Sequence, residues 1–233
     1  AKVKNILDKE KNKNPHYLSN NQVYDIMSAY RLPVIESISA RSHNKAAEVS
    51  EKIGFPVVLK AMSKDITHKS DVGGVKVDLR NRGEVIDAFY SIKDGVTHGG
   101  NGSFGGVQIQ KMVKYGKEVI LGMTSIDQFG PMLMFGLGGI FVETIKDVQF
   151  SPAPITDLEA DEMIRSIKGY PILEGIRGEK GVDTGIIKDC LFRLSQLVTD
   201  FECIRAIDIN PFIVSEKREL SYIVDARILV GKN

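Results

Sequence analysis

A lysine at the end of an apolar stretch is the first residue of this sequence whose position suggests chemistry. Lys60 closes the segment FPVVLK, which is typical of a buried strand. From the end of such a strand, a lysine can reach a phosphate group as a fixed point charge. Most lysines are solvated surface residues, so Lys60 alone is a weak indication of an anion site.

A polar loop after Lys60 carries the second candidate. His68 lies in THKSDVGGVKV, where Gly73 and Gly74 allow the backbone to approach a ligand closely or to move about a hinge. Neutral imidazole is abundant near pH 7 and has one free ring nitrogen, so a histidine can act as a nucleophile toward phosphorus. A histidine in a polar loop is more often a surface or turn residue, and both interpretations stay open from the residues alone.

A glycine-rich segment forms the third candidate. In FGLGGIFVE, the glycines Gly136, Gly138 and Gly139 interrupt an apolar stretch and could leave backbone N–H groups pointing at an anion. The segment is not a P-loop, because no GK[ST] follows, and it lacks the GxGxxG spacing of a dinucleotide site. A tight connection between strands explains the same glycines.

Two short polar segments near the end of the chain could bind a metal ion. DINP (208–211) and VDAR (224–227) place Asn210 and Asp225 near the ends of two strands that we expect to be neighbours. Oxygen ligands of this kind suit Mg²⁺, which proteins usually hold with one or two groups plus nucleotide phosphates. Asp225 could instead pair with Arg227 or with a nearby lysine.

The elements that must position these residues alternate along the chain. Ser19 or Asn20 can cap the first main helix, Ser42 can cap the second, and Gly54 can end it. Apolar spacing predicts helices over 18–32, 44–53, 83–94, 158–167 and 184–201. It predicts strands over 34–40, 55–61, 73–79, 107–113, 117–126, 131–138, 204–214 and 221–229.

This alternation predicts an α/β or α+β protein of two lobes. Residues 1–17 are polar, so we expect a mobile or peripherally packed N-terminal segment. The first lobe is expected over 18–106 and the second over 107–233, because the glycine-rich HGGNGSFGG suggests a connection there. A cleft between two lobes is the default position for a ligand.

Composition narrows the class of protein. The 233 residues are 42% hydrophobic and 26% charged, which is ordinary for a globular protein. A net charge of +1 gives no electrostatic reason to expect nucleic acid or a membrane surface as a partner. No stretch approaches the roughly 18 apolar residues that span a bilayer, and we expect a cytoplasmic protein. Cys190 and Cys203 have no metal-ligand spacing and are expected to be buried free thiols.

Taken together and in this order, the segments resemble the ATP-grasp (beta) subunit of nucleoside-diphosphate-forming acyl-CoA synthetases, which are related to succinyl-CoA synthetase. The resemblance runs from about Leu18 to the end of the chain. It implies an ATP-grasp fold in which two lobes clasp ATP or ADP, with Mg²⁺ near the strand ends. It rests on LSNNQVYDIMSAYRLPV, FPVVLKAMSKDITHKSDVGGVKV, KEVILGM, FGLGGIFVE, ILEGIRG, AIDINPFIV and VDARI.

The resemblance implies roles for single residues. His68 is similar to a phosphohistidine that takes phosphate from a partner subunit and passes it to the nucleotide. Asp208 would orient that imidazole or help to bind metal, and the turn at Gly138 and Gly139 would contact the travelling phosphate. The remaining implied contacts are Lys60 with the nucleotide phosphates, Gln110, Lys111 and Val113 with adenine, Glu118 in the nucleotide site, and Asn210 and Asp225 with Mg²⁺.

The implied reaction is acyl-CoA + ADP + phosphate = acid + CoA + ATP, which makes the protein an ADP-forming acetate–CoA ligase, an acid–thiol ligase. The chain has no glycine fingerprint for CoA. A separate CoA-binding, Rossmann-type alpha subunit is therefore expected as partner, in an α2β2 assembly.

The chain departs from the family pattern at one position that bears on function. Where the family usually reads E-[IL]-[DE]-[IVL]-N-P, this sequence has Ala206 in place of the first acidic residue. Two other functions also stay open, the first of them because of Ala206. One is a non-catalytic ATP-grasp regulatory module that has lost activity, and the other is an ATP-grasp carboxylate–amine ligase that forms an acyl phosphate directly.

Overall fold

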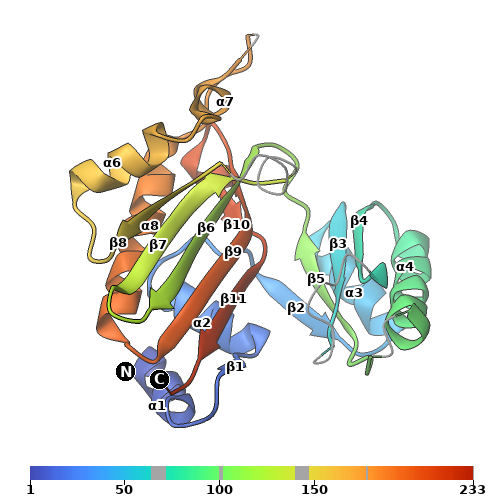
Figure 1. Ribbon diagram of the computed structural model, residues 1–233. Helices are drawn as coiled ribbons and strands as arrows, with labels where there is room; N and C mark the ends of the chain where they lie inside the picture. Colours follow the sequence, from blue (N-terminus) through green and yellow to red (C-terminus); the bar gives the residue numbers. More distant parts are fainter. Residues whose placement is uncertain (64–71, 100–101, 140–146, 177, 233) are drawn as a thin grey trace. The chain divides into compact units, whose positions relative to one another are not determined.

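The computed structural model describes residues 1–63, 72–99, 102–139, 147–176 and 178–232. The chain divides into two compact units, which we call the large unit (Ala1–Val34 with Tyr115–Asn233) and the small unit (Ile35–Lys114). Both combine helices with antiparallel sheets (Figure 1), so the architecture is the α+β alternative of the predicted class.

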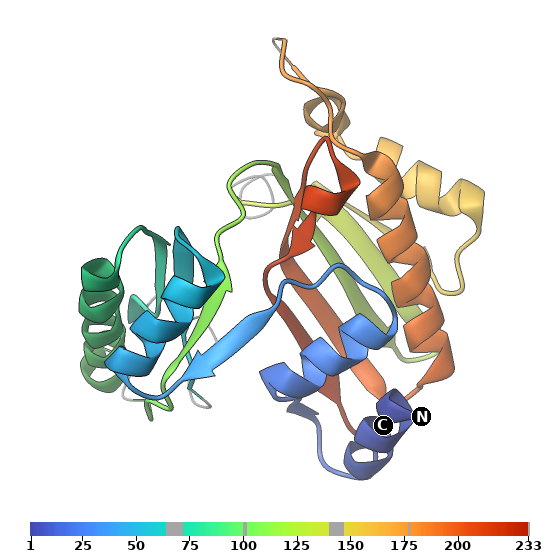
Figure 2. The same cartoon turned by 180° about the vertical axis from the view of Figure 1, so that it is seen from behind.

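The large unit is built on a seven-stranded sheet of order β1-β11-β9-β6-β7-β8, with β10 added beside β9. Its helices α1, α2, α6 and α8 cover one face, and Figure 2 shows that side. The strands are β1 (His16–Tyr17), β6 (Lys117–Ile126), β7 (Gly130–Leu137), β8 (Val148–Pro152), β9 (Ile204–Val214), β10 (Tyr222–Ile223) and β11 (Ala226–Val230). The helices are α1 (Lys2–Glu10), α2 (Asn20–Ala29), α6 (Asp157–Arg165), α7 (Tyr170–Glu174) and α8 (Thr184–Asp200), with a 3₁₀ turn at Arg218–Leu220.

Alternation along the strands decides which side chains face these helices. On β6, Val119, Leu121 and Met123 are buried in the core of the large unit. On β9, Ile207 and Ile209 are buried in the same core. Because successive side chains of a strand point to opposite faces, the residues between them lie on the other face of the sheet, which we call the open face.

The small unit is a four-stranded antiparallel sheet of order β2-β5-β3-β4 with two helices against it. Ser42 and Asn81 cap the helices by accepting N–H groups of their first turns, as expected for Ser42. Gly54 ends the first helix at φ +81°. The elements are β2 (Ser37–Ala40), α3 (His43–Ile53), β3 (Val57–Ala61), β4 (Val75–Leu79), α4 (Arg82–Asp94), a π-helical turn at Gly95–Gly99, and β5 (Val107–Lys111).

The unit boundaries differ from the lobes expected from the sequence, 18–106 and 107–233. Residues 107–111 belong to the small unit because β5 pairs with both β2 and β3. The N-terminal residues belong to the large unit, because β1 pairs with β11 and Val3 and Leu7 of α1 are buried in its core. The segment 1–17 is therefore packed, and the two lobes are not consecutive in sequence.

Most expected helices and strands are present, and the omissions have physical reasons. Ser19 forms the capping box with Gln22 at the start of α2. The elements α1, β1, α7 and β8 were not predicted, because they are short or mostly polar and depend on packing against other elements.

Two further expectations concern the thiols and the membrane. Cys190 is buried, and burial raises the pKa of its thiol to about 12. Cys203 is only half-buried, so the expectation of two buried thiols was wrong for this residue. Within the described ranges, no helix is both long enough and apolar enough to cross a bilayer.

We predict that Leu7→Ala lowers the free energy of unfolding of the large unit by about 2–4 kcal/mol, because it opens a cavity in a packed core. Leu7 is 1% exposed, whereas Leu158 on α6 is 67% exposed. Leu158→Ala serves as the matched control and should change the free energy by less than about 0.5 kcal/mol. Urea denaturation of both variants measures the difference; equal effects would show that α1 does not belong to the core.

Candidate functional site

The open face of the large unit carries a group of polar residues from β9 and the segment at β11. Asp208 lies on β9 between Gly122 of β6 and Arg227 of β11, which are its register partners. Directly opposed side chains on one face lie about 4.5–5.5 Å apart at Cβ, so Asp208 and Arg227 are within reach of each other. On the β6 side, Gly122 is packed closely, because a Cβ there would lie 3.0 Å from Cε of Met134.

Asn210 and Asp225 are neighbours, as the sequence predicted. The backbone N–H of Asn210 donates to the carbonyl of Asp225 at 3.2 Å. Asn210 is exposed and Asp225 half-exposed, and Oδ1 of Asp225 accepts the N–H of Ala226 at 3.1 Å. These are hard oxygen donors on adjacent segments, which fits a Mg²⁺ ion completed by phosphate or water oxygens. The described residues contain no group of three or more His, Cys, Asp or Glu in a metal-binding arrangement.

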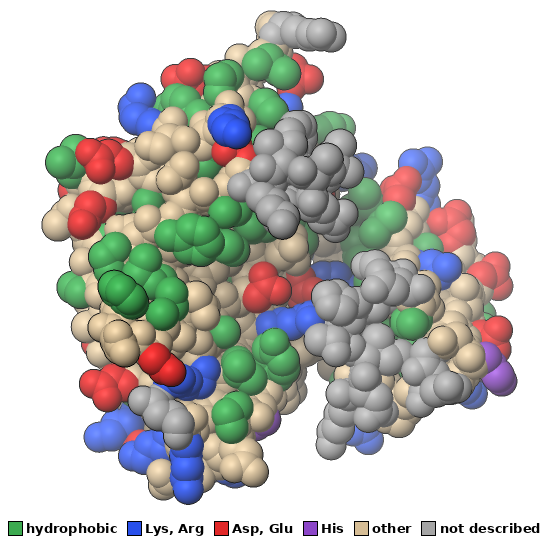
Figure 3. All heavy atoms as spheres, in the orientation of Figure 1, with side chains coloured by type: hydrophobic (Ala, Val, Ile, Leu, Met, Phe, Trp, Pro, Cys, Tyr) green, Lys and Arg blue, Asp and Glu red, His purple; other side chains and the backbone are tan. Residues whose placement is uncertain are grey.

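The open face is divided by chemistry across the sheet. Figure 3 shows acidic and basic side chains gathered over the β9–β11 part and apolar side chains over the β7–β8 part. Met134 and Phe150 belong to the apolar part, since both lie in the register row of Gly122 and Asp208. Ala206 lies two residues before Asp208 on β9, between Thr124 and Leu229, so the missing carboxylate leaves Asp208 as the acidic residue of this part of β9.

The glycine turn after β7 is packed tightly against Glu118. The N–H of Gly138 donates to the carbonyl of Glu118 at 2.7 Å. A Cβ at Gly138 would lie 2.9 Å from Cβ of Glu118, and Gly139 adopts φ +62°, which favours glycine. The structure therefore brings together three residues that the sequence analysis assigned to the same site.

A buried carboxylate behind this turn was missed. Asp147 accepts the N–H of Lys168 at 2.8 Å and that of Gly169 at 2.7 Å, and thereby ties the start of β8 to the start of α7. Gly169 is needed at this place, because a Cβ there would lie 2.0 Å from Cδ1 of Leu137 at the end of β7. These contacts join segments that are distant in sequence, so no local sequence motif predicts them.

In the small unit, Lys60 lies on the sheet face that α3 and α4 leave uncovered. The helices pack against Val57, Leu59, Val107 and Ile109. Lys60 is the register partner of Gln108, and Val58 is the partner of Gln110, so these alternate residues share the other face. We call it the polar face of the small unit. Lys60, Gln108 and Gln110 are only 8%, 6% and 8% exposed. Gln108 was missed, although alternation within VQIQK predicts it.

The side chain of Lys111 lies on the helix side of the small sheet and not on the polar face. The ammonium of Lys111 donates to the carbonyls of Gly54 at 2.5 Å and Phe55 at 3.0 Å. The Lys111 side chain therefore binds carbonyl groups at the C-terminal end of α3, on the helix side of the sheet. Only the backbone of Lys111 could contact a ligand on the polar face. Val113 is half-buried and follows the end of β5. His68 lies outside the described residues.

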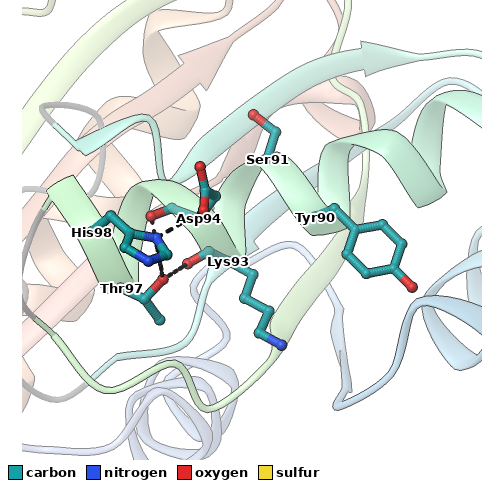
Figure 4. A pocket seen from close by; sticks show the side chains of 6 residues that line it. All are labelled: Tyr90, Ser91, Lys93, Asp94, Thr97 and His98. Carbon is teal, nitrogen blue, oxygen red and sulfur yellow. Dashed lines mark hydrogen bonds and ion pairs between the residues drawn. The ribbon is translucent and has the colours of Figure 1, made fainter.

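A surface hollow beside α4 is separate from all of these residues. Figure 4 shows that its labelled side chains come from α4 and the π-helical turn, with His98 directed at Asp94 and Thr97. Nδ1 of His98 lies 2.8 Å from Asp94 and 3.2 Å from the Thr97 hydroxyl. None of the six lining residues was predicted to act in the site.

The candidate residues thus form one group in the small unit and two in the large unit. The small unit contributes Lys60 and the two glutamines of the polar face, where a fixed positive charge and amide groups suit a phosphorylated ligand. The large unit contributes the glycine turn with Glu118, and the polar group of Asp208, Asn210 and Asp225.

Comparison with known proteins shows which family the chain resembles in sequence. The profile of a family described as ATP-grasp domain matches residues 9–230. The beta subunit of acetate–CoA ligase [ADP-forming] I of Pyrococcus furiosus is 43% identical over 99% of this chain and 98% of its own length. The 4-hydroxybutyrate–CoA ligase [ADP-forming] of Nitrosopumilus maritimus is 46% identical over 98% of this chain, which spans only 33% of that relative.

A solved structure gives the same result. It is described as dinucleotide forming acetyl-coenzyme A synthetase 1 of Ca. Korarchaeum cryptofilum with coenzyme A and Mg-AMPPCP, its phosphohistidine segment pointing towards the nucleotide binding site. It superimposes with a TM-score of 0.78 at 39% identity and covers 92% of each chain. The ATP-grasp fold expected from the sequence is thereby confirmed, and the chain belongs to the ATP-grasp family, in the group that includes the beta subunits of ADP-forming acetate–CoA ligases.

Proposed function

We propose that this chain is the nucleotide-binding subunit of an ADP-forming acyl-CoA synthetase, with acetyl-CoA as the expected substrate of the whole enzyme. The reaction would be acyl-CoA + ADP + phosphate = acid + CoA + ATP. The observation that carries the proposal is the pairing of β9 with the segment at β11, which brings Asn210 and Asp225 together beside Asp208 on the open face. Phosphoryl transfer to a nucleotide needs chiefly such positioned charges.

The nucleotide would be bound by both groups of residues. Lys60 would hold its phosphates, while Gln110, the backbone of Lys111 and Val113 would contact adenine. Glu118 would act in the same nucleotide site. Asn210 and Asp225 would hold Mg²⁺, which neutralises phosphate charge when bound. The Mg-AMPPCP in the Korarchaeum structure supports this choice of nucleotide and metal.

His68 would carry the phosphoryl group between two reactions. One of its ring nitrogens forms a P–N bond as the bond to the donor, a phosphohistidine of the partner subunit, breaks. The P–N bond then breaks as an oxygen of the ADP β-phosphate forms the new P–O bond, and the imidazole is released unchanged. Asp208 would orient the imidazole, and the turn at Gly138 and Gly139 would contact the phosphate through groups other than the N–H of Gly138, which is bonded to the Glu118 carbonyl. The phosphohistidine segment of the Korarchaeum protein supports this relay.

The acyl-CoA chemistry would belong to a separate CoA-binding, Rossmann-type alpha subunit, and α2β2 remains the expected assembly. The length comparison supports a partner. This chain matches the Pyrococcus beta subunit over 98% of its length, whereas in the Nitrosopumilus ligase it corresponds to 33% of a longer polypeptide. The rest of the Nitrosopumilus ligase would correspond to the separate alpha subunit. The expected place of action is the cytoplasm.

A non-catalytic regulatory module is the second candidate function, because Ala206 stands where the family usually has an acidic residue. The Ala206 side chain replaces the usual acidic residue two positions before Asp208, and the neighbours Thr124 and Leu229 supply no charge. A protein that lost phosphoryl transfer would still bind nucleotide through the rest of the site. Turnover in the presence of the partner separates the two functions.

We predict that His68→Ala abolishes phosphate labelling of this chain by labelled ATP and Mg²⁺, because the P–N bond has lost its nitrogen. The label on the wild type should be acid-labile, as a phosphoramidate is. His98→Ala is the matched control, since His98 is an exposed histidine of the small unit, and its labelling should match the wild type.

The same experiment decides between the functions. Label that survives in His68→Ala would reject the relay. A wild type that binds ATP but takes no label, with the partner subunit present, would favour the regulatory module or a direct carboxylate–amine ligase.

We predict that Asp225→Asn and Asn210→Ala each weaken Mg²⁺-dependent ADP binding about tenfold or more, as expected for a lost contact to a charged group. Asp127→Asn is the control, because the Asp127 side chain is 98% exposed on the β6–β7 connection. Titration calorimetry with ADP at several Mg²⁺ concentrations measures the effect. An unchanged dependence on Mg²⁺ would exclude both residues as ligands.

A further inference from the structure

One buried hydroxyl lacks a partner. In the part of the chain that the structure describes, Oγ of Ser37 is the single buried side-chain nitrogen or oxygen without a hydrogen bond. A buried polar atom normally finds a partner, because leaving it unpaired costs free energy relative to its hydration in the unfolded chain. An exception of this kind calls for a structural or functional explanation.

Ser37 lies on the polar face of the small unit. It begins β2, where it is the register partner of Gln110 on β5. The next residues in the register, Ile38 with Ile109 and Ala40 with Val107, belong to the helix side, where Ala40, Val107 and Ile109 are core residues. Alternation therefore directs Ser37 to the same face as Lys60 and Gln110.

The neighbours of Ser37 on this face differ from it. Lys60, Gln108 and Gln110 are all engaged by other groups. The Ser37 hydroxyl can donate one hydrogen bond and accept two, and it makes none of them with the described residues. Opposed residues on one face lie about 4.5–5.5 Å apart at Cβ, which lets Ser37 and Gln110 contact the same edge of a ligand.

The register also separates the two ends of a bound ligand. Lys60 is opposite Gln108, and Ser37 is opposite Gln110 on the other side of β5. With strands about 4.8 Å apart and a rise of about 3.4 Å per residue, the two positions are on the order of 12 Å apart. A ligand whose phosphates lie at Lys60 and which extends along β5 would thus present its non-phosphate end to Ser37.

We propose that Ser37 is a nucleobase-contacting residue, whose hydroxyl completes its hydrogen bonding on the base of an adenine nucleotide beside Gln110. The inference rests on the proposed function and extends it, since none of the expected site residues lies on β2. Adenine offers both a donor, its exocyclic amine, and ring-nitrogen acceptors, and a hydroxyl can satisfy either.

The proposal predicts that Ser37→Ala does not destabilise the free protein but weakens its binding of ADP. Without nucleotide, Ser37→Ala removes an unpaired buried hydroxyl, so the melting temperature should stay the same or rise. With nucleotide, the variant loses a hydrogen bond, so the dissociation constant for ADP should increase about 5- to 10-fold. A serine that merely stabilises the fold would lower the melting temperature instead.

Two probes and one control locate the contact. Calorimetry with ADP and with pyrophosphate, each with Mg²⁺, compares the full chain with its Ser37→Ala and Ser39→Ala variants. Pyrophosphate lacks a base, so its affinity should not change in Ser37→Ala. Ser39 lies on the same strand and face but is exposed, and Ser39→Ala should bind ADP like the wild type.

Several outcomes would overturn the inference. They are unchanged ADP affinity in Ser37→Ala, an equal loss for ADP and pyrophosphate, or a lower melting temperature of the free variant. If wild type bound pyrophosphate and ADP equally, no base contact would exist. A wild type that binds no ADP at all would overturn the proposed function itself, and the inference with it.

Discussion

The antiparallel register of β9 between β6 and β11 is the constraint on which the candidate site depends. It directs Ile207 and Ile209 into the helix-covered core and places Asp208 on the opposite face, in line with Gly122 and Arg227. A slip by one residue would exchange the two sets, burying charge and exposing the core, so the apolar residues fix the position of the polar ones. The small sheet obeys the same rule, which places Lys60 and the glutamines of β5 on one face.

Much of this could be predicted from local pattern. The helices with clear apolar spacing and strong caps were found, and DINP and VDAR were correctly expected on neighbouring segments. What failed depends on distant contacts. The helix at residues 2–10 shows only Val3 and Leu7 as buried residues, and it packs against α2, so its few apolar residues gave no clear helical pattern. Asp147 is recognisable only from its bonds to Lys168 and Gly169. For Lys111, the alternation within β5 was already in the sequence, and applying it would have placed the side chain on the helix side.

The fold holds several of the site residues in fixed positions, either in a tight turn or on paired strands. A backbone hydrogen bond joins Gly138 to Glu118, and the two residues are so close that a side chain at position 138 would collide with Glu118. The turn therefore has few alternative conformations. Ser37, Gln110 and Lys60 stand on paired strands, where the ladder sets their spacing. A site assembled on strands and tight turns is pre-organised, and less of the binding free energy is then spent on ordering it.

The large unit is interrupted in sequence, since residues 35–114 of the small unit separate its first 34 residues from the remainder. During synthesis, the small unit can complete its sheet as soon as β5 has emerged from the ribosome. The first strand of the large unit must wait for the last one, because His16 pairs with Val230. Until then, α2 lacks β11, the strand against which it packs in the complete fold.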